Sequence, residues 1–135
     1  MYLILIFLSI QLTPSFGQTG SDHTIQIKTL NKNRIPVDLE DCIKELDKVF
    51  SDSSRWITAM TETDFSATMH LGLGMWMRNN RKLWKGSQLS KYFSGKGIYH
   101  PDNMSDIILA SYYRHLKGQD IKLDEQIKYY QKYWE

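Results

Sequence analysis

Apolar residues recur every three or four positions from Pro36 to the C-terminus, and this spacing limits the fold more than any other feature of the chain. The clearest run lies on one face of a helix and consists of Leu39, Cys42, Ile43, Leu46, Val49 and Phe50. No segment after Pro36 alternates convincingly between apolar and polar residues, as a half-buried strand would. The sequence therefore predicts an all-α fold, a single compact domain of about six or seven short helices.

Capping residues divide this region into its helices. Thr61 and Ser87 each precede an apolar helical pattern and are suited to accept a hydrogen bond from the first turn. Asp102 or Asn103 is expected to cap the longest helix, and Gly118 stands at a good C-cap position for its end.

The first seventeen residues differ in kind from the rest. Met1–Gly17 contains no charged residue, and its apolar run is followed by Pro14 and by Ser15-Phe16-Gly17, a small-x-small pattern suited to signal peptidase. This pattern predicts a signal peptide over residues 1–17 and an exported protein, periplasmic or extracellular, whose mature chain begins at Gln18. The run is too short and too interrupted for a stable membrane span. The alternative is an N-terminal segment of the hydrophobic core.

Residues 18–36 are polar and are predicted to form a linker to a helical domain over residues 37–135. Thr24–Lys28 alternates briefly, but a single strand would have nothing to pair with. The lone cysteine, Cys42, excludes an intrachain disulfide framework. Since Cys42 lies on the apolar helix face, we expect a buried, unreactive thiol.

The segment His70–Trp84 combines two glycines, two tryptophans, two methionines and an Arg-Asn-Asn run, a density that no other segment matches. Gly72 and Gly74 are spaced like the start of a dinucleotide-binding fingerprint, but no strand precedes them and the third glycine is missing. They are expected instead to allow a tight turn or the close approach of a neighbouring helix.

A helix is predicted to begin near Gly74, with Arg78 and Arg81 one turn apart on its flank. Its stripe would consist of Trp76, Asn80 and Leu83 or Trp84. Asn79 and Asn80 are poor residues for a helix interior, so we expect them to cap the helix or to bond backbone groups. Trp76 is expected in the core.

Few residues in the chain suggest catalysis. The histidines form no ligand pair at metal-binding spacing and no cofactor motif is complete, so neither a metal site nor a cofactor is predicted. His100 and Asp102 are candidates for an acid–base pair, although His100-Pro101-Asp102 also suits the turn that starts a helix. We expect Arg78 or the asparagines to bond this turn, because a guanidinium suits a carboxylate or exposed carbonyls.

Aromatic residues are more numerous than a core of this size needs. Aromatic and arginine side chains are enriched where proteins bind one another. The candidate binding residues are therefore Trp76, Arg78, Asn79, Asn80, Arg81, Trp84, His100 and Asp102. Aromatic rings also stack on sugars or bases, but a net charge of +2 is too small to argue for nucleic acid.

Two stretches of the chain resemble an uncharacterised bacterial family, a domain of unknown function. They are Leu71–Asn80 and Gly97–Ser105, and the resemblance extends over Leu83-Trp84, Ser87, Leu89, Gln126-Ile127, Tyr130 and Tyr133-Trp134. The family pattern has a tryptophan where this chain has Arg81. The resemblance covers the chain from about Pro36 and implies a small helical domain of the same fold, with no assigned activity, cofactor or catalytic residue.

Two classes of function are consistent with these features. The first is a non-enzymatic interaction module that binds a protein or an envelope component, for example an immunity-type protein that neutralises a toxin. The alternative is a small hydrolase or cell-wall enzyme that uses His100, Asp102 and Arg78. The enzyme requires His70 or His100, Arg78 and Asp102 to converge on an open cleft. The module requires an exposed patch of aromatic and arginine side chains without such a cleft.

Overall fold

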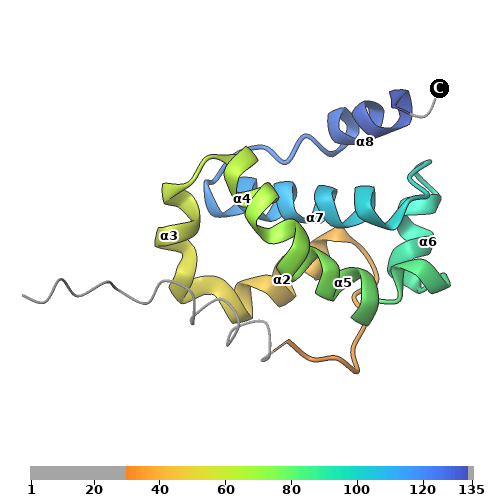
Figure 1. Cartoon of the computed structure of the whole chain (residues 1–135), viewed down its shortest axis with the longest axis horizontal. Coiled ribbons are helices and arrows are strands. Elements are labelled where there is room, and N and C mark those ends of the chain that lie inside the picture. Colours follow the sequence, from red (N-terminus) through yellow and green to blue (C-terminus); the bar gives the residue numbers. More distant parts are fainter. Residues whose placement is uncertain (1–29, 134–135) are drawn as a thin grey trace, which may run out of the picture.

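The longest helix, α7 (Pro101–Leu116), runs through the middle of the molecule, and every other α-helix contacts it (Figure 1). The computed structural model describes residues 30–133, and these form helices and connecting loops without any strand. The predicted all-α fold is therefore confirmed. The predicted signal peptide, the first part of the predicted linker and the last two residues lie outside the described residues.

The remaining elements follow one another with short connections. They are α2 (Leu39–Phe50), the 3₁₀ turn η1 (Ser51–Ser53), α3 (Ser54–Ala59), α4 (Glu62–Met69), the π-helical segment η2 (His70–Gly74), α5 (Met75–Asn80), the 3₁₀ turn η3 (Leu83–Lys85), α6 (Gln88–Ser94) and α8 (Leu123–Lys132). Among the described residues, no helix is both long and apolar enough to span a bilayer.

Helix α2 forms where the sequence predicted it and buries its apolar face against α7. The rings of Phe50 and Tyr112 pack with their centroids 6.3 Å apart. Cys42 is buried on this face, and its burial raises the pKa of the thiol far above its usual range. A thiol that stays protonated is a poor nucleophile, so the prediction of an unreactive cysteine agrees with its surroundings.

Two of the predicted caps are confirmed and one is wrong. Thr61 and Ser87 each accept a hydrogen bond from the backbone N–H three residues later. Helix α7, however, is capped by His100, whose Nδ1 accepts the N–H of Asp102 at 3.2 Å, and not by Asp102 or Asn103. The reason is Pro101, which lacks an N–H and has the backbone geometry of a first helical residue, so the helix begins there.

The folded part begins before the boundary at residue 36 that the sequence suggested. Leu30 and Pro36 are buried, and Leu30 belongs to the hydrophobic core. The carbonyls of Asn31 and Arg34 accept hydrogen bonds from Arg81, 2.7 and 2.6 Å long. Residues 30–36 thus pack along the domain because Arg81 satisfies their backbone.

The central segment folds differently from the single helix predicted from Gly74 to Trp84. Helix α4 passes through η2 into α5, which ends at Asn80, and Lys82 then takes a left-handed conformation with φ 52°. The predicted stripe is therefore broken, and Trp84 in η3 is 58% exposed. A π-helical turn also shifts the faces of the residues that follow it. Arg78 and Arg81, predicted on the flank of a helix, consequently point into the protein.

Gly74 shows why a glycine is needed in this segment. A Cβ at this position would lie 3.1 Å from Nη1 of Arg78 and 3.3 Å from the carbonyl of Met69. It would also lie 3.6 Å from Leu109 of α7. The closest side-chain group is the guanidinium of Arg78, from the same helical run, whereas Leu109 of the neighbouring helix α7 lies at an ordinary contact distance. The structure therefore does not show the close approach of a neighbouring helix that the sequence suggested.

Candidate functional site

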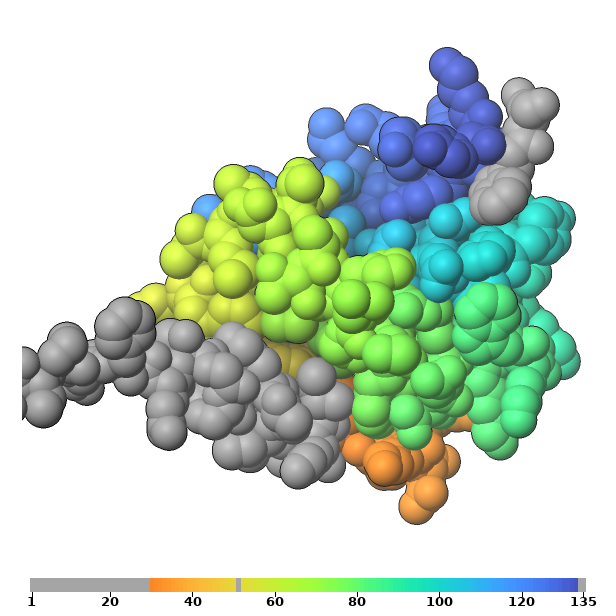
Figure 2. Space-filling view, in the orientation of Figure 1, coloured from red at the N-terminus to blue at the C-terminus, as the bar shows by residue number. Residues whose placement is uncertain are grey.

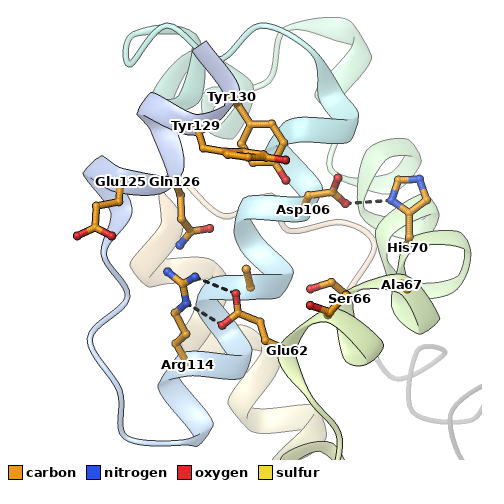
Figure 3. A pocket seen from close by; sticks show the side chains of 12 residues that line it. Glu62, Ser66, Ala67, His70, Asp106, Arg114, Glu125, Gln126, Tyr129 and Tyr130 are labelled. Carbon is orange, nitrogen blue, oxygen red and sulfur yellow. Dashed lines mark hydrogen bonds and ion pairs between the residues drawn. The ribbon is translucent and has the colours of Figure 1, made fainter. Parts of the chain in front are cut away.

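A cleft of about 660 Å³ opens between α4, α7 and α8. We call it the α8 cleft, and Figure 3 shows the side chains that line it. Its polar and aromatic lining residues are Glu62, Thr63, Ser66, His70, Asp106, Arg114, Glu125, Gln126, Tyr129 and Tyr130. Three helices that are distant in sequence therefore bring polar groups of both signs together with two tyrosines.

A bidentate ion pair forms one wall of the α8 cleft. Nε and Nη2 of Arg114 donate to the two carboxylate oxygens of Glu62, both at 2.8 Å (Figure 3). Nη1 of Arg114 also donates to the carbonyl of Ile121 at 2.7 Å, in the loop before α8. The hydrogen bond to Glu62 raises the pKa of Arg114. This paired geometry holds α4, α7 and the start of α8 together.

His70 and Asp106 form a second pair at the cleft, with Nδ1 2.9 Å from Oδ1. Both side chains are partly exposed, so the imidazole is accessible from the cleft. Ser66 also lines the cleft, but Nε2 of His70, the ring nitrogen that does not face Asp106, points away from Ser66 (Figure 3). In the described part of the chain no hydrogen bond joins Ser66 to His70, so His70 is not placed to activate this serine as a nucleophile.

Two adjacent tyrosines of α8 complete the cleft. Tyr129 is 62% exposed, whereas Tyr130 packs against the hydrophobic core, and their rings meet edge to face at 5.1 Å. Burial raises the pKa of Tyr130 to about 12. Tyr130 therefore supports the wall of the cleft, and Tyr129 presents its ring to solvent.

The α8 cleft is negatively charged in a chain whose net charge is positive. Its lining includes the carboxylates of Glu62, Asp106 and Glu125 and the guanidinium of Arg114. Three carboxylates thus line the cleft beside one guanidinium and the imidazole of His70, whereas the whole chain carries a net charge of +2. A site of this sign attracts cationic groups.

The sequence-predicted residues Arg78 and Asp102 meet, as expected, but not in the α8 cleft. Nε of Arg78 lies 3.0 Å from Oδ1 of Asp102, and its Nη1 donates to Oγ of Ser105 at 2.8 Å. Its Nη2 donates to the carbonyl of His70 at 3.2 Å. With only 8% of its side chain exposed, Arg78 connects the central segment to the start of α7 from the inside.

Arg81 is the most deeply buried charged side chain among the described residues, with 2% exposed. Besides the two carbonyls described above, its Nη2 donates to Glu45 at 2.6 Å. The ring of Trp76 lies 4.5 Å from its Cζ atom. Burial raises the pKa of Glu45 and lowers that of Arg81. Removing Arg81 and Glu45 from water therefore costs free energy, and their ion pair together with the hydrogen bonds of Arg81 to two carbonyls offsets this cost.

The other predicted binding residues divide between structural and exposed positions. Nδ2 of Asn80 donates to the carbonyl of Trp76 at 2.9 Å, which confirms that an asparagine bonds the backbone here, while Asn79 is exposed. Trp84 packs edge-on against the ring of His100, with the centroids 5.5 Å apart. The candidate residues thus do not form one surface.

Sequence analysis missed the α8 cleft as a site. His70 and Asp106 are 36 positions apart, and Arg114 and Glu62 are 52 positions apart, so no local spacing indicated either pair. The excess of tyrosines near the C-terminus was the one available signal. In residues 30–133, no group of three or more His, Cys, Asp or Glu side chains is placed to hold a metal ion.

We expect Trp76→Ala to lower the free energy of unfolding by about 2 kcal/mol, roughly half the loss for a fully buried ring. The ring is only half-buried, but it packs against the core and covers the guanidinium of Arg81. Trp84→Ala is the matched control, with an expected loss within about 0.5 kcal/mol because that ring is exposed. Urea unfolding measures both values, and equal losses would contradict the assignment of Trp76 to the core.

Comparison with known proteins identifies a family for most of the chain. A family model described as a domain of unknown function (DUF6794) matches residues 35–116. The match begins just before α2 and ends with the last residue of α7, so α8 lies beyond it. None of the curated proteins and none of the solved structures matches the chain.

Proposed function

The chain belongs to the family described as a domain of unknown function (DUF6794), and we propose that it is an exported, non-enzymatic binding domain whose partner site is the α8 cleft. The observation that carries this proposal is that some polar groups are engaged inside the protein, whereas others face solvent in one cleft. The ion pair of Arg78 and Asp102 does not line the α8 cleft, whereas paired charges and Tyr129 face solvent there.

The chemistry of the α8 cleft favours a protein partner with a basic side chain. A lysine or arginine would meet the face of Tyr129 and the carboxylate of Glu125, both exposed on α8. It would compete there with Lys122, whose ammonium lies 3.7 Å from Glu125 on the protein surface. The bidentate pair of Glu62 and Arg114 keeps its geometry without a ligand, so little order is lost on binding. Exposed tyrosines beside fixed charges are typical of interaction hot spots.

The export part of the proposal rests on residues 1–17. We expect the protein recovered from an envelope fraction or culture medium to have the mass of a chain that begins at Gln18, because Ser15-Phe16-Gly17 suits signal peptidase. A bulky residue at the cleavage site, in Gly17→Tyr, should leave the longer precursor. An intact terminus at Met1 in the exported wild-type protein would contradict this proposal.

Site-specific photo-crosslinking tests the partner site. A photoreactive phenylalanine in place of Tyr129 should give a crosslinked protein adduct in the native compartment, and the same group at exposed Lys48 on α2 should not. Charge reversal by Glu125→Lys should abolish the adduct if a basic group enters the cleft. Asp52→Lys, at an exposed position outside the cleft, is the matched control. Equal crosslinking at both positions, or an adduct that survives Glu125→Lys, would overturn the proposal.

The His70–Asp106 pair supports a second candidate, a small hydrolase. An imidazole whose Nδ1 is held by a carboxylate is arranged as a general base usually is. In this candidate the His70–Asp106 pair takes the place of the predicted group of His100, Asp102 and Arg78. The reason is that the guanidinium of Arg78 is already bonded to Asp102 and Ser105. Hydrolysis of cell-wall material by the mature protein, lost in His70→Ala but retained in His115→Ala, would favour the enzyme over the binding domain.

A further inference from the structure

A second hollow, of about 420 Å³, lies on the other side of Tyr130 from the α8 cleft. We call it the neutral hollow, because the described residues that line it include no Lys, Arg, Asp or Glu. It is lined by Gly97, Ile98, Tyr99, His100, Asn103, Tyr130 and Gln131. From this combination of aromatic and amide groups, we propose that the neutral hollow binds an uncharged glycan, a short stretch of pyranose rings.

The walls of the neutral hollow are built by close packing of α8 on the loop after α6. Gly97 has φ +80°, and a Cβ there would lie 2.5 Å from Nε2 of Gln131. The same Nε2 donates to the carbonyl of Lys96 at 3.0 Å. In the space-filling view α8 and the segment that follows α6 lie at the same end of the molecule (Figure 2). Glycine at this position allows the left-handed backbone angle, which other residues rarely adopt, while Gln131 packs closely beside it.

Charged residues next to the neutral hollow in sequence are engaged elsewhere. The ammonium group of Lys96 lies 5.0 Å from the ring centroid of Tyr92, and the carboxylate of Asp102 pairs with Arg78. Among the described residues, the lining thus offers a charged ligand no counter-ion other than the imidazole of His100, whose Nδ1 lies 3.7 Å from Oδ2 of Asp102. An uncharged ligand does not need a counter-ion when it leaves water. The charge of the lining therefore favours a neutral glycan over nucleic acid or a charged peptide.

The shape of a pyranose matches the remaining groups. One face of the sugar ring presents C–H bonds, which pack on aromatic rings, and its rim presents hydroxyls, which exchange hydrogen bonds with amides. Tyr99 is 75% exposed at the edge of the hollow, and Tyr130 forms its inner side. Asn103 and Gln131 supply amide groups from two different helices. The exposed ring of Trp84, in contact with His100, extends the aromatic surface beside the hollow.

Titration calorimetry with neutral oligosaccharides tests the proposal on the mature chain, residues 18–135. The probes are tetramers of N-acetylglucosamine and of glucose, and we expect at least one to bind. Tyr99→Ala should weaken that binding about tenfold or more, and Tyr99→Phe should retain it, because stacking needs the ring and not its hydroxyl. Tyr133→Ala is the matched control, since Tyr133 is equally exposed, at 76%, and does not line the hollow.

Three results would overturn the inference. They are the absence of heat with both sugars at several millimolar, equal effects of the Tyr99 and Tyr133 variants, and preferential binding of an uncharged apolar peptide. Both substituted tyrosines are exposed, so unchanged melting temperatures would show that folding is preserved. The inference does not rest on the proposed partner site, because Tyr129→Ala should leave sugar binding intact while it removes the contact in the α8 cleft.

Discussion

Replacing Arg81 by alanine is expected to lower the free energy of unfolding by about 3–5 kcal/mol, the range for removal of one partner from a buried ion pair. The variant would leave the carboxylate of Glu45 in a largely desolvated position without its guanidinium. It would also leave the carbonyls of Asn31 and Arg34 without their donor. The N-terminal segment that begins at Leu30 should then detach from the core.

Two variants separate this effect from a simple loss of charge. Arg81→Lys should recover little stability, because an ammonium cannot reach two carbonyls and a carboxylate in the planar geometry of the guanidinium. Lys82→Ala removes a neighbouring exposed cation and is the surface control. Chemical denaturation followed by circular dichroism measures all three. Full recovery in Arg81→Lys would show that charge alone, and not the hydrogen-bond geometry, stabilises this region.

Arg78→Ala is expected to lower the free energy of unfolding by about 1–3 kcal/mol, because it removes the guanidinium that bonds the buried hydroxyl of Ser105 and pairs with Asp102. The carbonyl of His70 loses one of its donors but keeps the N–H of Met75. Asp102, which is partly exposed, can be hydrated when its partner is lost, so the cost should be smaller than at Arg81. Arg78→Lys should restore little, since lysine cannot serve three acceptors that lie in different directions.

The same variant distinguishes a structural role of Arg78 from a functional one. If the arginine only connects the central segment to α7, melting temperature and partner binding should fall together in Arg78→Ala. An unchanged melting temperature with loss of binding would instead place Arg78 in the partner site. Asp102→Asn, which keeps the shape of the carboxylate but removes its charge, should give a milder form of the structural outcome.

The residues of these predictions can be compared with the part of the chain that matches the family. Arg78, Arg81 and the cleft pairs Glu62–Arg114 and His70–Asp106 all lie within residues 35–116. Helix α8 with Tyr129 lies beyond the match and supplies the remaining wall of the α8 cleft and one wall of the neutral hollow. Tyr129, the exposed tyrosine that we assign to partner binding, therefore lies on a helix outside the matched residues.

Local features of this protein followed from the sequence alone. The apolar face of α2, the caps Thr61 and Ser87 and the turn at Gly118 depend on residues within one or two helical turns of each other. Interactions of this range act in an isolated segment, so spacing and residue type predict them. The contact between Arg78 and the start of α7 was also predictable, because a buried turn next to a carboxylate needs a donor of that kind.

Only the tertiary structure decided which polar residues are buried and which face a cleft. A π-helical turn and the left-handed Lys82 change the direction of the chain around Gly74–Trp84, where the regular apolar spacing predicted one helix. Arg81 consequently points into the core and Trp84 into solvent, the reverse of what a continuous stripe implied. The pairs of the α8 cleft join helices across many residues of intervening chain. Their meeting depends on how whole helices pack around α7, and this packing is a property of the complete core that no single stretch of sequence contains.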